Sequence, residues 1–230
     1  MFKIISEQPD FIVVDKNIGV NFHDEGDLGA GLFSQVKAYL QQQHSHNELY
    51  PVHRLDKMTS GLVMFAKNQH SAQRFGELFA KHDIEKYYLA ISDKKPTKKQ
   101  GLIKGDMAKS RRGMFKLMRT MENPAITQFF SYSVANKQRL YLLKPHSGKT
   151  HQLRVALSSI SAPIIGDPLY NSNSVADRGY LHAYCLKFTY ANTPYTFLAK
   201  PSTGELFLAD STTQALALLN EPWLLNWPKL

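Results

Sequence analysis

Cysteine is almost absent from this 230-residue sequence, and long apolar runs are absent altogether. The single cysteine, Cys185, cannot form an internal disulfide, so the chain suits a reducing compartment. No apolar run approaches the roughly 18 residues of a membrane-spanning helix, and residues 1–15 lack the basic and apolar regions of a secretion signal. We therefore expect a cytoplasmic protein with neither a membrane span nor a secretion signal.

The common signatures of cofactor-dependent enzymes and hydrolases are also missing. The sequence has no Gly-x-Ser-x-Gly, no HExxH, no CxxC and no GxGxxG turn. Gly-Lys-Thr at 148–150 is not a phosphate loop, because Leu143 stands where that motif needs its first glycine. Four histidines follow no metal-ligand spacing: His23, His44, His46 and His53. We expect no cofactor and no metal.

Positive charge is plentiful and unevenly distributed. The formal net charge is +9, from 28 Lys plus Arg against 19 Asp plus Glu, and the segment from Lys81 to Arg119 accounts for +8 of it. Residues 94–99 are typical of a solvated loop. From Lys109 onward, however, cations alternate with apolar residues, as in a strand with one cationic face. Such a face suits the phosphate backbone of a nucleic acid.

Short strand patterns and amphipathic helix patterns follow one another along the chain, without an internal repeat or a Pro/Ser/Gly-rich linker. Helical spacing occurs around 32–40, 72–79, 153–160 and 212–219. Strands are expected at 11–15, 62–66, 87–92, 126–134, 140–143, 181–190 and 195–199. We predict one α+β domain over residues 1–230, with a mixed, mostly antiparallel sheet and flanking helices.

Polar residues gather in the segment 51–61, directly before the expected strand 62–66. Within it, Asp56 is flanked by Arg54 and Lys57, and nearby cations favour an ionised carboxylate. Loops held on a rigid strand often carry catalytic groups. The alternative is that Asp56 and Thr59 only cap a turn, and both interpretations stay open here.

A second polar cluster, residues 146–154, leads into the helix expected around 153–160. The N-terminus of a helix has exposed N–H groups and a dipole that favours anions. Together with Lys149, His151 and Arg154 it would suit a phosphate or a carboxylate. The alternative is a surface helix whose Arg154 pairs with a nearby acid.

Taken together, these segments resemble the RluA-type family of RNA pseudouridine synthases. Residues 53–62, His-Arg-Leu-Asp-Lys-Met-Thr-Ser-Gly-Leu, match the family signature HRLDxxTSG(L/V). Lys-Tyr-Tyr-Leu-Ala at 86–90 resembles the second motif, and Gly-Lys-Thr-His-Gln-Leu-Arg at 148–154 resembles the third. Shorter similarities follow in the family's order at 125–127, 166–170 and 181–183.

The resemblance implies a catalytic domain with an active-site cleft and an isomerase that needs no metal, nucleotide or redox cofactor. In this reaction the N1 glycosidic bond of a uridine breaks, the uracil turns in place, and C5 is joined to the ribose. The resemblance assigns Asp56 as the catalytic carboxylate, Tyr88 as the active-site tyrosine and Arg154 as the partner of that aspartate. Contacts with the substrate are expected from Arg54, Thr59 and Leu153.

The implied partner is RNA, either ribosomal or transfer. For a compact single domain we expect a monomer. Many relatives carry an S4-like RNA-binding domain upstream, whereas here the catalytic pattern begins almost at Met1. We therefore expect the basic strip, which runs from Lys94 to Arg119, to bind the RNA, through Lys109, Arg111 and Arg112. The sequence departs from the family at 14–19, which replaces the usual Asn-Lys-Pro, and at Ser147, where the family has threonine.

Two other functions remain open at this point. An RNA-binding or RNA-folding protein that does not depend on catalysis would share the basic strip. A hydrolase acting on a phosphorylated or nucleoside small molecule would use Asp56 as nucleophile, but the motifs contain no residue that would activate water.

Overall fold

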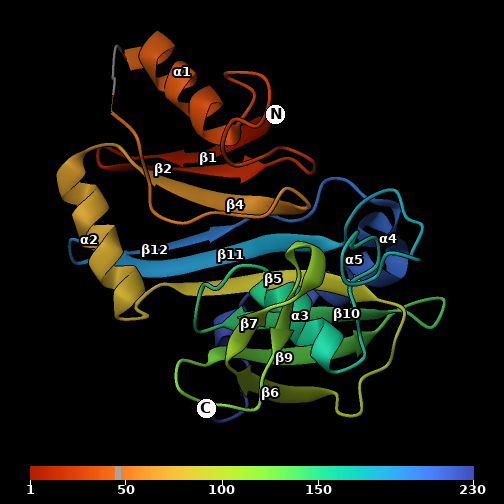
Figure 1. Cartoon of the computed structure of the whole chain (residues 1–230). Helices are drawn as coiled ribbons and strands as arrows, with labels where there is room; N and C mark the ends of the chain where they lie inside the picture. Colours follow the sequence, from red (N-terminus) through yellow and green to blue (C-terminus); the bar gives the residue numbers. More distant parts are fainter. Residues whose placement is uncertain (45–47) are drawn as a thin grey trace. The chain divides into compact units, whose positions relative to one another are not determined.

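The computed structural model describes residues 1–44 and 48–230, which leaves His46 outside the described residues. The chain forms two compact units (Figure 1). Unit 1 comprises Met1–Ile84 and Cys185–Lys200, and unit 2 comprises Glu85–Tyr184 and Pro201–Leu230. Both combine strands with helices, so the α+β class is confirmed. The single domain over residues 1–230 stays a prediction.

Antiparallel strands form the base of unit 1. Strand β1 (Phe2–Glu7) pairs with β2 (Phe11–Lys16), and β2 pairs with β4 (Thr59–Ala66). The short β3 (Tyr50–Pro51) pairs with the end of β4. Every residue of β4 is buried. The segment between β3 and β4, which carries the first motif, is therefore anchored to a rigid strand.

Two helices and a second strand pair complete unit 1. Helix α1 (Leu32–His44) follows β2, and α2 (Gln69–Ala80) follows and contacts β4. A capping box starts α2, because the side chain of Asn68 accepts a hydrogen bond from the backbone N–H of Ser71 at 2.7 Å. Strand β12 (Thr193–Leu198) pairs with β11 (Leu181–Tyr190), which belongs to unit 1 from Cys185 onward.

An aromatic cluster joins these elements in the core of unit 1. The Phe11 ring of β2 packs edge-on against Phe75, Phe188, Tyr190 and Tyr195, with centroid distances of 5.1 to 5.8 Å. Edge-to-face packing of this kind adds to the stability gained by burying the rings. The cluster therefore fixes α2 and the β11–β12 pair against β2.

Unit 2 contains a run of antiparallel strands, in the order β5–β10–β9–β6. Its strands are β5 (Glu85–Ser92), β10 (Arg139–Pro145), β9 (Ala125–Ser133) and β6 (Gln100–Gly105). Helix α3 (Gln152–Ser159) follows β10 and contacts β9. The second and third motifs therefore lie on β5 and at the start of α3.

The C-terminal part of unit 2 is helical. It contains α4 (Glu205–Leu208), α5 (Asp210–Ala217) and a 3-10 turn at Pro222–Leu224. The helix expected at 212–219 is thus confirmed, beginning and ending two residues earlier. No helix in the described residues is both long enough and apolar enough to cross a membrane.

The basic strip is not one strand, which corrects the sequence-based prediction. Strands β7 (Met107–Lys109) and β8 (Phe115–Leu117) pair antiparallel and are joined by a turn at Arg111–Gly113. Arg112 and Gly113 have positive φ angles of 54° and 74°, which reverse the chain. We call residues 106–120 the basic arm. In Figure 1 the arm lies beside α3, with which β8 makes contact.

Asp106 closes the basic arm at its base. Its backbone N–H donates to the carbonyl of Thr120 at 2.9 Å. Its carboxylate accepts from the backbone N–H groups of Glu122 at 3.0 Å and Asn123 at 2.8 Å. The side chain of Thr120 and these N–H groups lower the pKa of Asp106. The two ends of the arm are therefore tied together.

Candidate active site

The residues predicted to form the site are divided between the two units. Arg54, Asp56 and Thr59 belong to unit 1. The remainder belong to unit 2: Tyr88, Lys109, Arg111, Arg112, Leu153 and Arg154. The roles of all nine stay predictions, and the local geometry of each set follows from its own unit.

The loop that carries the first motif, residues 52–58, is held at its C-terminal end by Lys16. This lysine is fully buried, and its Nζ donates to the carbonyl oxygens of Val20 at 2.8 Å, Asn17 at 3.1 Å and Lys57 at 3.3 Å. The same Lys57 carbonyl accepts the backbone N–H of Gly19 at 3.0 Å. The segment 14–19, which departs from the family pattern, therefore fixes the residue after the predicted catalytic aspartate.

Other residues of the first motif fix the loop at its centre and at its N-terminal end. Nε2 of His53 accepts the backbone N–H of Met64 in β4 at 3.0 Å, and Leu55 is buried. The backbone N–H of Thr59 donates to the carbonyl of Asp56 at 3.0 Å, so the turn considered from the sequence is present. The Asp56 side chain is half-buried. A turn and a catalytic role are thus compatible at this position.

Tyr88 lies in β5, opposite Leu143 of β10, and is largely buried. Lys86 is two residues earlier and therefore on the same face of the strand. Burial lowers the pKa of Lys86 to about 8. A Cβ atom placed on Gly148 would lie 3.8 Å from Nζ of Lys86. The fold therefore brings the second and third motifs together within unit 2.

Gln152 organises the turn of the third motif. Its Oε1 accepts from the hydroxyl of Ser147 at 2.8 Å and from the backbone N–H of Lys149 at 3.1 Å. Its Nε2 donates to the carbonyl of Ile126 at 3.1 Å and to the hydroxyl of Thr127 at 3.0 Å. The departure from threonine to Ser147 therefore keeps the hydroxyl that this turn uses.

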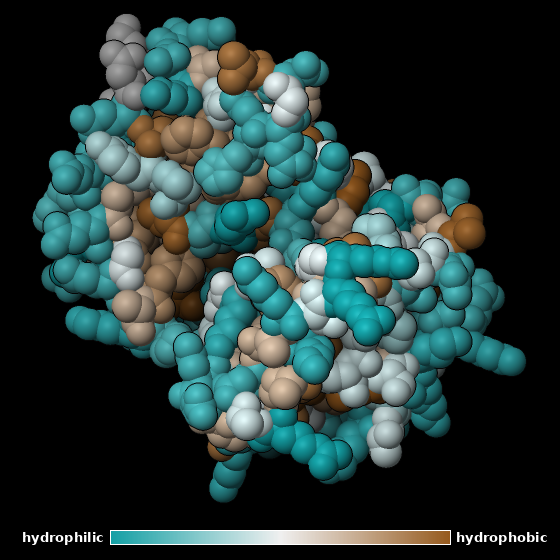
Figure 2. All heavy atoms as spheres, in the orientation of Figure 1, coloured by the Kyte–Doolittle hydropathy of each residue, from teal (hydrophilic) through white to brown (hydrophobic). Residues whose placement is uncertain are grey.

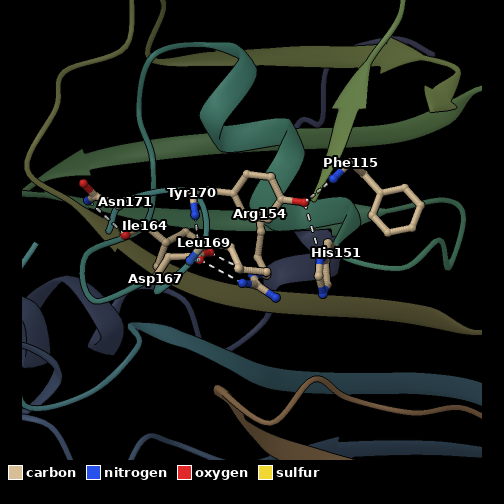
Figure 3. Close-up of polar contacts among 8 residues, drawn as sticks. All are labelled: Phe115, His151, Arg154, Ile164, Asp167, Leu169, Tyr170 and Asn171. Atoms are coloured by element: carbon tan, nitrogen blue, oxygen red, sulfur yellow. Dashed lines mark hydrogen bonds and ion pairs between the residues drawn. The ribbon is translucent and has the colours of Figure 1, made fainter. Parts of the chain in front are cut away.

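Arg154 forms a buried ion pair with Asp167 (Figure 3). Its Nε and Nη2 donate to the two carboxylate oxygens at 2.7 and 2.8 Å. Arg154 is only 4% exposed and Asp167 is fully buried. Arg154 thus pairs with an acid, as the alternative to an anion site expected, but α3 presents it to the interior and not to the surface.

Burial alone would raise the pKa of Asp167. The adjacent Arg154 guanidinium and the backbone N–H groups of Leu169 and Tyr170 outweigh that effect, so the pKa lies below its usual value. The two N–H groups donate to Oδ1 of Asp167 at 2.9 and 3.0 Å. Asp167 is therefore ionised at neutral pH.

The interpretation of this helix start as an anion site is not supported. The ammonium of Lys149 donates to the carbonyl of Asn123, and its backbone N–H is bonded to a side chain of the third motif. Nδ1 of His151 lies 3.2 Å from the hydroxyl of Tyr170. The cations that suggested the site are thus engaged within the protein.

Asp167 and Tyr170 were not predicted as site residues. The similarity at 166–170 was the available signal, but a motif position does not say which side chain it meets in the fold. Gly166 shows why the turn has this sequence. Its φ is +72°, and a Cβ atom there would lie 2.0 Å from the carbonyl oxygen of Arg178.

The cations of the basic arm point outward. Five are exposed, and within the described part of the chain none of them forms an ion pair: Lys109, Arg111, Arg112, Lys116 and Arg119. Figure 2 shows hydrophilic side chains over the part of unit 2 where the arm lies. By contrast, Leu153 is buried, as are Thr59 and Arg154.

No group of three or more His, Cys, Asp or Glu in the described residues is arranged to hold a metal ion. Cys185 is buried within β11, as expected of a small apolar residue.

Residues 10–159 match the model of the RNA pseudouridylate synthase family. The chain belongs to this family. An RNA pseudouridine synthase of Haemophilus influenzae, described as uncharacterized, is 43% identical over 225 residues, which are 96% of this chain and 98% of the relative. These matches confirm the RluA-type family and an isomerase acting on RNA.

Two further proteins are also similar to this chain. Ribosomal large subunit pseudouridine synthase C of Rickettsia bellii is 33% identical over 187 residues, covering 78% of this chain and 61% of the relative. The structure of human RNA pseudouridylate synthase domain containing 4 superimposes with a TM-score of 0.74 at 23% identity, covering 94% of this chain and 93% of the other. At that identity, the structural match concerns the fold.

Proposed function

We propose that this pseudouridine synthase isomerises a specific uridine in ribosomal or transfer RNA, with Asp56 as the catalytic carboxylate. The observation that carries this proposal is the first motif at 53–62, whose aspartate occupies a loop held by a buried lysine and by β4. A carboxylate held in one place is what a reaction at a single ribosyl carbon requires.

The chemistry assigns a role to each predicted residue. The carboxylate of Asp56 acts at the ribose, by attack on C1′ or by removal of a ribose proton. The bond from N1 to C1′ breaks, C5 forms the new bond to C1′, C5 loses its proton, and N1 is protonated. Tyr88 offers an aromatic face for the uracil, and Arg154 acts in the same reaction as the partner that the family motif assigns to the catalytic aspartate.

Binding of the RNA requires an accessible base and contacts to the backbone. A uridine within a helix has to be flipped out or already unpaired, and Arg54, which is exposed, is suited to fill the vacated stack. The exposed cations of the basic arm are suited to contact phosphates. The name of the Rickettsia relative supports ribosomal RNA as the first substrate to test.

The test is tritium release from C5 when the purified protein is incubated with ribosomal or transfer RNA labelled at that position. We expect Asp56→Asn to lower the single-turnover rate by at least about 10³-fold, because it removes the carboxylate while keeping its size. RNA affinity, measured by filter binding, should remain close to that of the wild type.

The matched control is Asp83→Asn, which makes the same change at an exposed aspartate of unit 1. It should retain the wild-type rate. Normal turnover by Asp56→Asn would refute the assigned role of this residue. Absence of turnover by the wild type on both RNA classes would refute the proposed substrate.

A further inference from the structure

Arg154 is held along one edge by Asp167. The two N–H···O bonds, at 2.7 and 2.8 Å, run in parallel from Nε and Nη2 to the two carboxylate oxygens. A bidentate pair of this kind fixes the plane of a guanidinium as well as its position. Because both groups are buried, the pair is screened much less than an ion pair at the surface.

Tyr170 holds the same guanidinium on its face. The centroid of its ring lies 5.1 Å from Cζ of Arg154, within the range of a cation–π contact. In Figure 3 the Tyr170 ring lies beside Arg154, while Asp167 meets the end of the arginine side chain. Edge and face are thus held by two residues of the same four-residue turn, 167–170.

The turn that carries these two residues is itself fixed. The backbone N–H of Tyr170 donates to Asp167 at 3.0 Å. The Tyr170 hydroxyl accepts the backbone N–H of Phe115 at 2.8 Å and lies 3.2 Å from Nδ1 of His151. Phe115 belongs to the basic arm and His151 directly precedes α3. The turn that holds Arg154 is therefore linked through Tyr170 to the basic arm and to the residue that precedes α3.

We propose that Asp167 and Tyr170 are positioning residues that fix the direction of the Arg154 guanidinium during the reaction. Asp167 takes two of its five N–H groups, and the plane set by Asp167 and Tyr170 determines where the other three are aimed. This inference rests on the proposed role of Arg154 and adds the residues through which the fold controls it.

The first test is Asp167→Asn. The amide keeps the size of the carboxylate but offers one acceptor oxygen in place of two, so the guanidinium loses its fixed plane. A displacement of about 1 Å in a catalytic group costs on the order of 10²-fold in rate. We expect the single-turnover rate at saturating RNA, measured per folded molecule, to fall by about that factor. The Kd for RNA should stay close to the wild-type value.

Tyr170 provides a second test that does not touch the ion pair. Tyr170→Phe keeps the ring over Arg154, whereas Tyr170→Leu removes it. We expect Tyr170→Leu to lose more of the saturated rate than Tyr170→Phe. Because Tyr170 is only partly buried, this pair keeps the proposal testable if Asp167→Asn folds poorly.

Asp177→Asn is the matched control. Asp177 also lies in unit 2 and accepts hydrogen bonds from the Tyr180 hydroxyl and the backbone N–H of Glu205. The substitution is chemically identical and removes no contact of Arg154, so the rate per folded molecule should be that of the wild type. Circular dichroism measures the folded fraction of each variant. An equal loss of rate in Asp177→Asn would overturn the proposal, since the effect would then be general.

Arg154→Lys separates this inference from its premise. If Arg154→Lys reacts at the wild-type rate, the assigned role of Arg154 fails, and the positioning role fails with it. If Arg154→Lys is inactive while Asp167→Asn and Tyr170→Leu react at the wild-type rate, only the positioning role is overturned. A reduced rate with unchanged RNA affinity in all three variants supports it.

Discussion

Asp167 keeps its charge in a fully buried position because folding supplies it with partners. An aspartate in the unfolded chain titrates near pH 3.9, whereas partners from Arg154 and the backbone lower the pKa in the folded protein despite the opposing effect of burial. The folded state therefore binds fewer protons, and the stabilisation is fully present above about pH 4. It is lost as the pH falls through the folded pKa.

From this follows a pH-dependent difference between the wild type and Asp167→Asn. Removing one partner of a buried pair costs roughly 3–5 kcal/mol, so the free energies of unfolding should differ by about that much at neutral pH. Below about pH 4 the difference should shrink, because Asp167 of the unfolded wild type then takes up a proton that the folded protein binds only at lower pH. Urea unfolding from pH 3 to 7 measures this. A difference that stays constant across the range would contradict the prediction.

Lys16 is the residue through which unit 1 controls the loop of Asp56. Its ammonium group donates hydrogen bonds to three carbonyl oxygens, and one of these belongs to Lys57. Lys16→Met keeps the length of the side chain but leaves those carbonyls without this donor. Each unsatisfied buried group costs about 1–3 kcal/mol. We expect lower stability and a lower rate at saturating RNA.

Lys3→Met, at an exposed lysine of β1, is the control and should change neither. Wild-type turnover by Lys16→Met would show that the loop does not need this anchor.

At the scale of elements, the sequence predicted the helices and strands whose apolar residues recur at strongly regular spacing. Strands β4 and β11 and helices α1 and α2 carry enough apolar residues at regular spacing to be recognised. Strands β1 and β6 were missed. Each pairs with a single neighbour and is only partly buried, so selection for alternating apolar residues is weak there.

The basic arm shows a different limit. Its alternation of cations and apolar residues was real, but each strand has only three residues, and the reversal depends on positive φ angles at Arg112 and Gly113. A non-glycine residue in that conformation leaves little trace in the sequence. The base of the arm depends in turn on Asp106, whose partners lie at 120, 122 and 123.

The candidate site divides along the same line. Asp56, Tyr88 and Arg154 were predicted as site residues because they occupy specific motifs. The pairing of Arg154 with Asp167 was not, although the two are 13 residues apart. It depends on which face of α3 turns inward and on how the turn 167–170 folds back. Those are properties of tertiary packing, and a single sequence does not show which residues the packing brings together.

For the whole molecule, the decisive feature is where the charge lies. The chain has a net charge of +9, of which residues 81–119 supply +8. If charge acted only as a general attraction, any three exposed lysines would contribute alike to RNA binding. If the arm contacts phosphates directly, each lost contact releases one fewer counterion. The slope of log K against log salt then flattens by about 0.7 for single strands and about 0.9 for duplexes.

Two triple variants that remove equal charge distinguish these cases. One replaces Lys109, Arg111 and Arg112 by alanine, and the other replaces the exposed Lys3, Lys200 and Lys229, so both have a net charge of +6. We expect the arm variant to bind RNA more weakly and its salt slope to flatten by roughly 2 to 3 in total, while the second variant keeps a near wild-type slope. Filter binding of the substrate RNA from 50 to about 200 mM salt measures both. Equal slopes for the two variants would mean that the RNA backbone is bound elsewhere and that the arm contributes only its share of the overall field.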